Sequence, residues 1–175
     1  MLKKVIIVLA VSLALIVSPL YAQAKFLFHA TKRAAAKKIA LRGFSTRKMN
    51  PKARFGKGVY LAESKKLALK EKPSADAVIK LKDTKLLHKN SIYTRKLSKK
   101  NLKRISGDKD LRGNIRKGVL SGDLAKKLGR GAGKQGKVVV SPSAKGKGLD
   151  TFVPKKVYKA HPGIVATRNT DVLRR

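Results

Sequence analysis

Two short apolar segments of the chain each carry one side chain that packing alone does not require. His29 follows Leu27-Phe28, and Tyr60 follows a turn in which Gly56 and Gly58 flank a lysine. These residue types offer hydrogen bonding, an aromatic face for stacking and a close backbone approach to a ligand. Each also has an ordinary structural explanation, because a strand histidine is often hydrogen-bonded within the fold and a strand tyrosine often packs in the core.

The glycine turn does not match a phosphate-binding loop by itself. Gly56 and Gly58 lack the third glycine of a dinucleotide-binding fingerprint, and the Gly-Lys-Ser/Thr sequence of a P-loop is absent. The order and spacing of the two segments therefore carry more information than either segment alone: His29 lies 31 residues before Tyr60.

Together, the two segments resemble the His and Tyr motifs of the ADP-ribosyltransferases of the diphtheria-toxin and poly(ADP-ribose) polymerase type. The stretch 55–62, Phe-Gly-Lys-Gly-Val-Tyr-Leu-Ala, is similar to the tyrosine block of that family, and Phe28-His29-Ala30-Thr31 is similar to its His-Gly-Thr/Ser block. Gly43-Phe44 and Ser64-Lys65 also agree with the family pattern. The resemblance covers residues 26 to about 82.

This resemblance implies a site that binds NAD as a substrate. His29 would hydrogen-bond a ribose hydroxyl of the adenosine half, and the backbone of Ala30 would hold the nicotinamide amide. Thr31 would brace this turn, Gly58 would belong to the same cofactor-binding set, and Tyr60 would stack on the cationic nicotinamide ring. The family has glycine at the position of Ala30, so the methyl group is a departure from the pattern.

The resemblance also implies a third catalytic position at the start of a later strand, where the family has Glu. Asp150 is the first candidate, and Thr151 is the alternative, which would leave no carboxylate. A carboxylate would stabilise the positive charge that develops when the nicotinamide–ribose bond breaks. His29, Tyr60 and Asp150 are therefore the expected catalytic residues. We expect the His29 and Tyr60 side chains to open onto one cleft, with Asp150 or Thr151 at its rim.

The charge of the chain predicts a polyanionic partner. Lys and Arg number 44 against nine Asp and Glu, which gives a formal net charge of +35. Self-repulsion of this size destabilises a compact protein unless a surface of opposite sign is at hand. The Lys-rich segment 95–134 predicts contact with nucleic acid or another polyanionic surface, through unspecific attraction more than base reading. A basic proteome or a requirement for solubility would also explain the charge without a partner.

The residue types that the chain lacks exclude some kinds of catalytic and metal-binding site. The chain has no cysteine, so it has no thiol nucleophile, thiolate metal site or disulfide. Its three histidines do not have the spacing of a metal-ligand set, and we expect no metal site.

The N-terminus has the layout of a secretory signal peptide. Two lysines precede the apolar run 5–17, and Ala22-Gln23-Ala24 is a small-x-small cleavage site. The run is too short for a comfortable membrane span. We therefore predict a signal peptide over residues 1–24, cleavage after Ala24, and a secreted or periplasmic protein without a stable membrane span. The mature chain, 25–175, is expected to be a single domain; an uncleaved N-terminal anchor is the alternative.

The remaining pattern predicts an α+β fold with a mixed, mostly antiparallel split sheet of ADP-ribosyltransferase type. Thr31 and Ser64 are the expected N-caps of two helices. The predicted helices lie at 34–41 and 65–72, and the predicted strands at 26–28, 59–61, 77–81, 138–140, 151–153, 157–158 and 164–166.

Residues 84–135 are interpreted as a basic insertion of short helices. Apolar residues at helical spacing predict three of them, around 97–105, 115–120 and 124–128. The glycines of 129–133 predict a flexible loop.

Two functional hypotheses follow. The first is a secreted NAD-dependent mono-ADP-ribosyltransferase or NAD glycohydrolase that acts as a toxin or effector on a protein or nucleic-acid acceptor. The second is a transferase-like scaffold without turnover that binds nucleic acid or another polyanion, which Ala30 and the unsettled third position favour. Salt-sensitive binding without NAD consumption would distinguish the second from the first.

Overall fold

The fold was obtained as a computed structural model, which describes residues 26–107, 115–116, 119–120 and 122–174. The strands are β1 (Phe26–Thr31), β2 (Gly58–Ala62), β3 (Ala77–Lys82), β4 (Ser91–Tyr93), β5 (Ile115–Arg116), β6 (Val119–Leu120), β7 (Val138–Pro142), β8 (Leu149–Pro154) and β9 (Ala166–Arg174). The helices are α2 (Arg33–Arg42), α3 (Lys65–Glu71), α4 (Lys85–Lys89), α5 (Lys99–Ser106), α6 (Gly122–Lys134) and α7 (Lys155–Ala160), with two 3-10 turns, η2 (Thr94–Lys96) and η3 (Pro162–Ile164). The predicted signal peptide, 1–24, lies outside the described residues.

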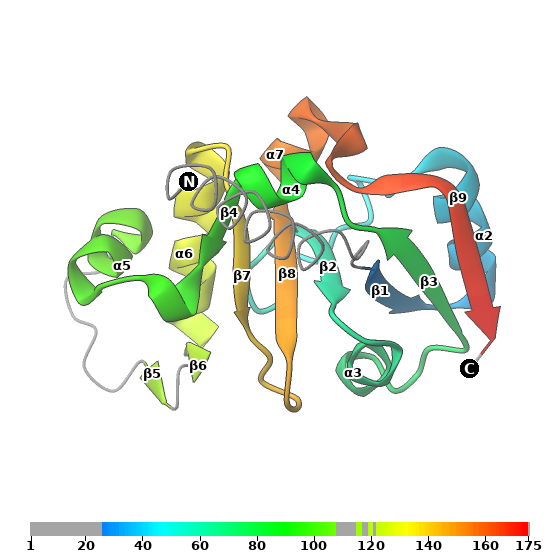
Figure 1. Cartoon of the computed structure of the whole chain (residues 1–175), viewed down its shortest axis with the longest axis horizontal. Coiled ribbons are helices and arrows are strands. Elements are labelled where there is room, and N and C mark those ends of the chain that lie inside the picture. The colour runs from blue at the N-terminus through cyan, green and yellow to red at the C-terminus, as the bar shows by residue number, and fades with distance from the viewer. Residues whose placement is uncertain (1–25, 108–114, 117–118, 121, 175) are drawn as a thin grey trace, which may run out of the picture.

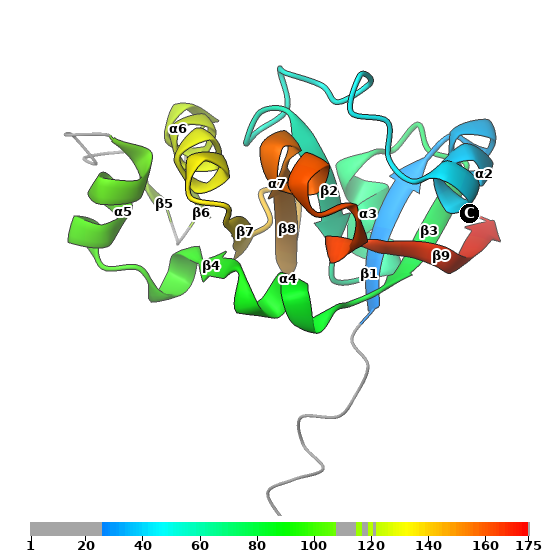
Figure 2. The ribbon, with the colours of Figure 1, turned by 90° about the horizontal axis from the view of Figure 1, so that it is seen from above.

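One mixed sheet organises the fold. Its seven strands follow the order β4-β7-β8-β2-β1-β3-β9, and β5 and β6 form a separate pair. Within the large sheet β4 and β7 are parallel, and the other pairs are antiparallel. The prediction of an α+β fold with a mixed, mostly antiparallel sheet is confirmed. Helix α5 lies at one end of the molecule, and α2 with β9 lies at the other (Figure 1, Figure 2).

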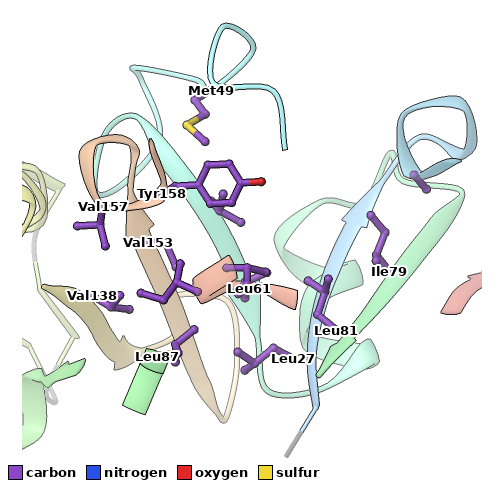
Figure 3. Packing of buried hydrophobic residues seen from close by; sticks show 14 of the residues in the cluster. Leu27, Met49, Leu61, Ile79, Leu81, Leu87, Val138, Val153, Val157 and Tyr158 are labelled. Carbon is purple, nitrogen blue, oxygen red and sulfur yellow. The ribbon is translucent and has the colours of Figure 1, made fainter. Parts of the chain in front are cut away.

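The sheet is weakly joined between β1 and β2. These strands share one register pair, Phe28 with Ala62. By contrast, β1 pairs with β3 along its whole length, and β2 pairs with β8 along its whole length. Figure 3 shows β1 and β2 diverging away from their shared end. The two motif segments of the sequence therefore stand on either side of the weakest joint in the sheet.

Strand alternation divides the core between the two faces of the sheet. On one face, Leu27, Leu61 and Val153 pack with Val157 and Tyr158 of α7 and with α2 (Figure 3). On the other face, a small cluster joins β1, β2 and β3 to α3, and a larger one joins β7 and β8 to α5 and α6. The small cluster consists of Ala30, Ala62, Leu67, Ala68, Ala75 and Val78. The larger cluster consists of Phe55, Leu102, Ile105, Leu120, Leu124, Ala125, Leu128, Ala132, Val139 and Phe152.

Helix α6 replaces the flexible loop predicted at 129–133. The three glycines of that stretch lie inside the helix because their missing side chains let it approach its neighbours closely. A Cβ on Gly129 would meet the Phe55 carbonyl, one on Gly131 would meet the Ile105 carbonyl of α5, and one on Gly133 would meet Pro154. The glycine run therefore serves helix packing, which a sequence pattern does not distinguish from a loop.

Two further predictions are wrong in type, and a third is wrong in where its strand begins. Residues 157–158 belong to helix α7, where Val157 and Tyr158 both reach the core from one short turn. The segment expected as a helix around 115–120 forms the paired strands β5 and β6. The strand expected at 164–166 begins only at Ala166, because η3 precedes it.

Of the two N-caps predicted from the sequence, one is present in the structure and the other is not. The Ser64 hydroxyl accepts the Leu67 N–H, as predicted for the start of α3. At the start of α2 the N-cap is Lys32, which makes no side-chain cap. The Arg33 N–H instead donates to Asp76 Oδ1 at 2.6 Å, from the chain just before β3. A carboxylate distant in sequence therefore takes the role expected of Thr31.

The basic segment 84–135 is more than an appended group of helices. It supplies β4, an edge strand of the central sheet whose Ser91, Ile92 and Tyr93 pair with β7. It also supplies Leu87, which packs in the cluster shared by α2 and α7. In the part of the chain described, each helix is too short or too polar to cross a membrane.

Candidate active site

His29 connects the two motif segments directly. Its Nδ1 lies 2.8 Å from the backbone carbonyl of Tyr60. A carbonyl oxygen can only accept, so Nδ1 carries the proton and Nε2 holds the lone pair. Burial lowers the pKa of His29, the Tyr60 carbonyl raises it, and the positive charge of Lys72 lowers it. The imidazole is therefore a neutral ring with an assigned tautomer.

The two side chains do not open onto one cleft, which corrects the prediction. Antiparallel partners project from the same face, and the register pairs Phe28 with Ala62. That register places His29 on the face of Leu61 and Tyr60 on the opposite face. The His29 ring accordingly meets Phe44 edge-on at 5.0 Å, on the α2 side of the sheet. The contact between the motifs runs through the backbone of Tyr60 and not through its ring.

The Tyr60 hydroxyl holds the glycine turn that precedes it. It accepts the Phe55 N–H at 2.8 Å and donates to the Gly56 carbonyl at 2.8 Å. Gly56 has a φ of 90°, which favours glycine. The half-buried ring lies 4.9 Å from that of Phe152, and burial raises the pKa of the phenol. The motif tyrosine is thus fixed in place by its own turn.

The neighbouring motif residues have clear structural reasons. A Cβ on Gly58 would collide with the Phe152 ring and the Val153 carbonyl, so glycine is needed where β2 meets β8. The Ala30 methyl packs with the cluster of Ala62 and Val78, on the face away from His29. Thr31 is buried at the end of β1. The methyl group that departs from the family pattern therefore enters the core.

Asp150 lies on the same face as Tyr60 but is buried, so it does not stand at a rim. It pairs with Ala62 on one side and with Ser141 on the other, and the residue is 6% exposed. Arg54 Nη1 lies 3.9 Å from its Oδ2. Oδ1 is buried and has no hydrogen-bond partner among the described residues. Thr151, the alternative, is buried on the opposite face beside Leu61.

Arg54 is anchored above this carboxyl by contacts of its own. The guanidinium donates to the carbonyls of Pro142 at 3.1 Å and Leu120 at 3.3 Å, and it lies 4.9 Å from the centre of the Phe55 ring. Burial lowers the pKa of Arg54, while Asp150, Glu71 and Tyr60 raise it. Both members of the ion pair have therefore lost much of their hydration.

Burial decides the titration of Asp150. Its pKa rises to about 7, first because of burial and then because of the charge of Glu71. Nearby Ser143 and the charge of Arg54 lower the pKa but do not offset the burial. At neutral pH the carboxyl is therefore divided between its protonated and ionised forms.

Sequence reasoning missed several residues around the site. Arg54, Glu71 and Ser143 surround Asp150, and Tyr158 supports Phe44 by accepting its N–H at 2.9 Å. Only Glu71 carried a signal, because an acidic residue is rare in this chain and this one stands in a lysine-rich helix. The other three have common roles that no local pattern reveals. Within the described ranges no cluster of three or more His, Cys, Asp or Glu could hold a metal ion.

Comparison of the chain with protein-family models and with curated proteins gives no match.

Proposed function

We propose that the protein is a secreted NAD-dependent mono-ADP-ribosyltransferase or NAD glycohydrolase of the His–Tyr type, which acts as a toxin or effector. The observation that carries the proposal is the hydrogen bond from His29 to the Tyr60 backbone, at the joint where β1 and β2 separate. The two motifs that resemble the transferase family meet there, although they are distant in sequence.

The state of His29 suits recognition of a ribose. With the proton on Nδ1, Nε2 accepts a hydrogen bond from a hydroxyl. The lowered pKa keeps the ring neutral at pH 7, so this acceptor is retained. The bond to the Tyr60 carbonyl also fixes the plane of the ring. A ribose hydroxyl of the adenosine half of NAD is the ligand group that we assign to it.

Tyr60 and Asp150 supply the other two elements but lie on the opposite face of the sheet from His29, so the proposal requires NAD to bind across the joint between β1 and β2, which one register pair holds together. The Tyr60 ring is held by its hydroxyl, so its face is fixed for stacking on the cationic nicotinamide ring. When the nicotinamide–ribose bond breaks, the electron pair leaves with nicotinamide and positive charge develops on the ribose. An ionised Asp150 stabilises that charge. Because the pKa of Asp150 is about 7, we expect activity to rise with pH through neutrality.

The test measures nicotinamide release from NAD by the mature chain. His29→Asn places an amide N–H near the position of Nδ1, so it keeps the bond to Tyr60 and loses the acceptor at Nε2. We expect this variant to fold and to release no nicotinamide, and we expect no release by Tyr60→Ala. His161→Asn, at an exposed histidine, is the matched control and should retain full activity. Undiminished release by both His29→Asn and Tyr60→Ala would show that the assignment is wrong.

A second candidate function, polyanion binding, is favoured by the outer surfaces of α5 and α6. The exposed residues of these helices are predominantly basic: Lys99, Lys100, Lys103, Arg104, Lys126, Arg130 and Lys134. Asp123 is the one acidic residue in either helix. The α5 end of the molecule lies away from α2 and β9 (Figure 1). We propose that this surface draws the protein to nucleic acid or another polyanion, either as its acceptor or as its sole ligand.

Salt dependence tests the second candidate. Binding to a labelled DNA duplex should weaken as the salt concentration rises. A plot of the logarithm of the binding constant against the logarithm of the salt concentration should have a slope of about −0.9 for each phosphate neutralised. Replacing Lys99, Lys100 and Lys103 by Gln should flatten that slope, whereas replacing Lys32, Lys37 and Lys38 near α2 removes equal charge and should change it less. Equal effects of the two triple variants would assign the binding to net charge alone.

A further inference from the structure

The two edges of the large sheet differ in length. One edge is β4, which has three residues, and the other is β9, which has nine and is the longest strand. Among the described residues, β3 is the only strand that pairs with β9. An edge strand offers open backbone groups to any extended chain, and proteins commonly protect it by shortness or by lysine. Strand β4 is short, whereas β9 is long and contains no lysine, in a chain with 44 lysines and arginines.

A hollow lies beside this edge, where α2 packs against β9 (Figure 1, Figure 2). Its volume is about 220 Å³, and it is lined by Arg33, Lys37, Ala77, Val172 and Leu173. Arg33 and Lys37 are exposed and lie one helical turn apart, so they share a face of α2. Val172 is 37% exposed, as one of four exposed large apolar residues in the described part of the chain. Because pockets for drug-sized molecules measure roughly 300–1,000 Å³, this hollow suits a side chain better than a whole ligand.

The register of β9 directs Val172 toward the hollow. Val172 pairs with Ile79 of β3, and Ile79 packs in the cluster that contains Ala36 of α2. Directly opposed residues of paired strands project from the same face, so Val172 lies on the α2 face. Asp171 lies on the opposite face, where it forms an ion pair with Lys80. A residue added opposite Val172 would therefore meet the apolar part of the hollow and would point away from the carboxylate of Asp171.

Charge decides which kind of strand fits this edge. Two copies of the chain carry a formal net charge of +35 each, so joining two β9 edges would bring like charges together. Strand β9 itself contains two arginines and one aspartate, and the hollow adds Arg33 and Lys37. A carboxylate on the α2 face of an added strand would meet these cations, while an apolar residue would pack on Val172. Since alternate residues of a strand share a face, the two residues would be two positions apart.

We propose that β9 is a docking edge for an extended segment of a partner protein, which adds a strand to the large sheet and carries an apolar and an acidic residue two positions apart. Backbone hydrogen bonds along β9 supply affinity, and the hollow beside Val172 selects the sequence. The proposal goes beyond the NAD site and does not use it, so either can fail without the other.

A designed peptide of the length of β9 tests the edge. It alternates valine and glutamate on one face and has threonine on the other, and fluorescence anisotropy measures its binding. A protein with a net charge of +35 attracts any acidic peptide, so the control is the same peptide with N-methyl groups on successive central amides, which keeps every charge and removes the backbone donors. We expect the parent peptide to bind and to shift the β9 amide resonances, and the methylated peptide to do neither. Equal affinity of the two peptides, or shifts confined to α5 and α6, would overturn the proposal.

Three variants locate the contact within the hollow. Val172→Thr keeps the shape and strand propensity but buries a hydroxyl under the peptide, and Lys37→Gln removes a cation. We expect the first to weaken binding about fivefold and the second by up to about fivefold. Lys38→Gln removes the same charge at the next exposed position of α2, which is not among the described residues that line the hollow, and should have a smaller effect. Equal effects of Lys37→Gln and Lys38→Gln would show that the hollow does not select the peptide.

Sedimentation of the protein alone distinguishes a foreign strand from a second copy. We expect a monomer, because the like charges of two β9 edges oppose their pairing. A dimer that the parent peptide dissociates would assign the edge to a second copy of this chain and would overturn the proposal of a partner strand.

Discussion

Asp150→Asn tests whether burial or the Arg54 ion pair decides the energy of the site. The substitution keeps the shape of the side chain and removes its titration. In the folded protein the pKa of Asp150 is about 7, raised from an ordinary 3.8. The protonated form is thus favoured by folding, so this contribution to stability is complete below pH 3.8 and is lost as pH rises to about 7. The difference between these two pKa values corresponds to about 4 kcal/mol at most.

Urea unfolding at several pH values between 4 and 9 measures the effect. At acid pH we expect Asp150→Asn and wild type to unfold at similar urea concentrations. Above about pH 7 the variant should be the more stable protein, by up to about 4 kcal/mol. Comparison of variant with wild type at each pH cancels the titration of the other acidic residues.

Asp171→Asn is the matched control, because Asp171 forms an ion pair of the same length, 3.9 Å, with Lys80 on the surface. Its side chain is 67% exposed, so the pair should contribute less than about 1 kcal/mol at any pH. The reasoning would be refuted if Asp150→Asn were less stable than wild type above neutral pH. That result would mean that the attraction of Arg54 outweighs the cost of burying the charge.

Three other predictions concern packing and hydrogen bonding. Gly131→Ala forces a methyl group against the Ile105 carbonyl and should destabilise the fold by about 1–3 kcal/mol in urea, whereas Gly122→Ala in the same helix meets no atom within 4 Å and should not. Tyr60→Phe removes the hydroxyl that holds the glycine turn and should lower stability by about 1–3 kcal/mol. An unchanged melting temperature would show that the turn forms without it. Asp76→Ala removes the acceptor of the first N–H of α2 and should cost about 1 kcal/mol, with faster amide exchange in that turn if the cap is real.

Several strands and the two motif segments were the predictable part of the fold. Strand β2, helix α3 with its Ser64 cap, and the apolar run of β7 follow from local patterns that agree with their tertiary settings. Helix α7 was missed because a six-residue helix with two buried residues looks the same as a short strand. The 129–133 glycines were misread because close helix packing and loop flexibility require the same residue.

The residues of the candidate site could be proposed from the sequence, but their arrangement in space could not be predicted. His29, Tyr60 and Asp150 were identified from local motifs, whereas their faces depend on the register between β1 and β2. A shift of one residue in that register moves every side chain to the other face, and sequence patterns do not fix it. The ion pair of Arg54 with Asp150 was out of reach for a similar reason, because the two residues meet only after the chain has folded.

The position of β4 has a consequence for how this protein can be cut or grafted. The strand borders the large sheet, so excising 84–135 would strip β7 of its parallel neighbour and leave a row of open backbone donors and acceptors. A truncated chain of that kind invites intermolecular strand addition. The basic segment 84–135 and the large sheet therefore form one structural unit, and the protein should be expressed with both.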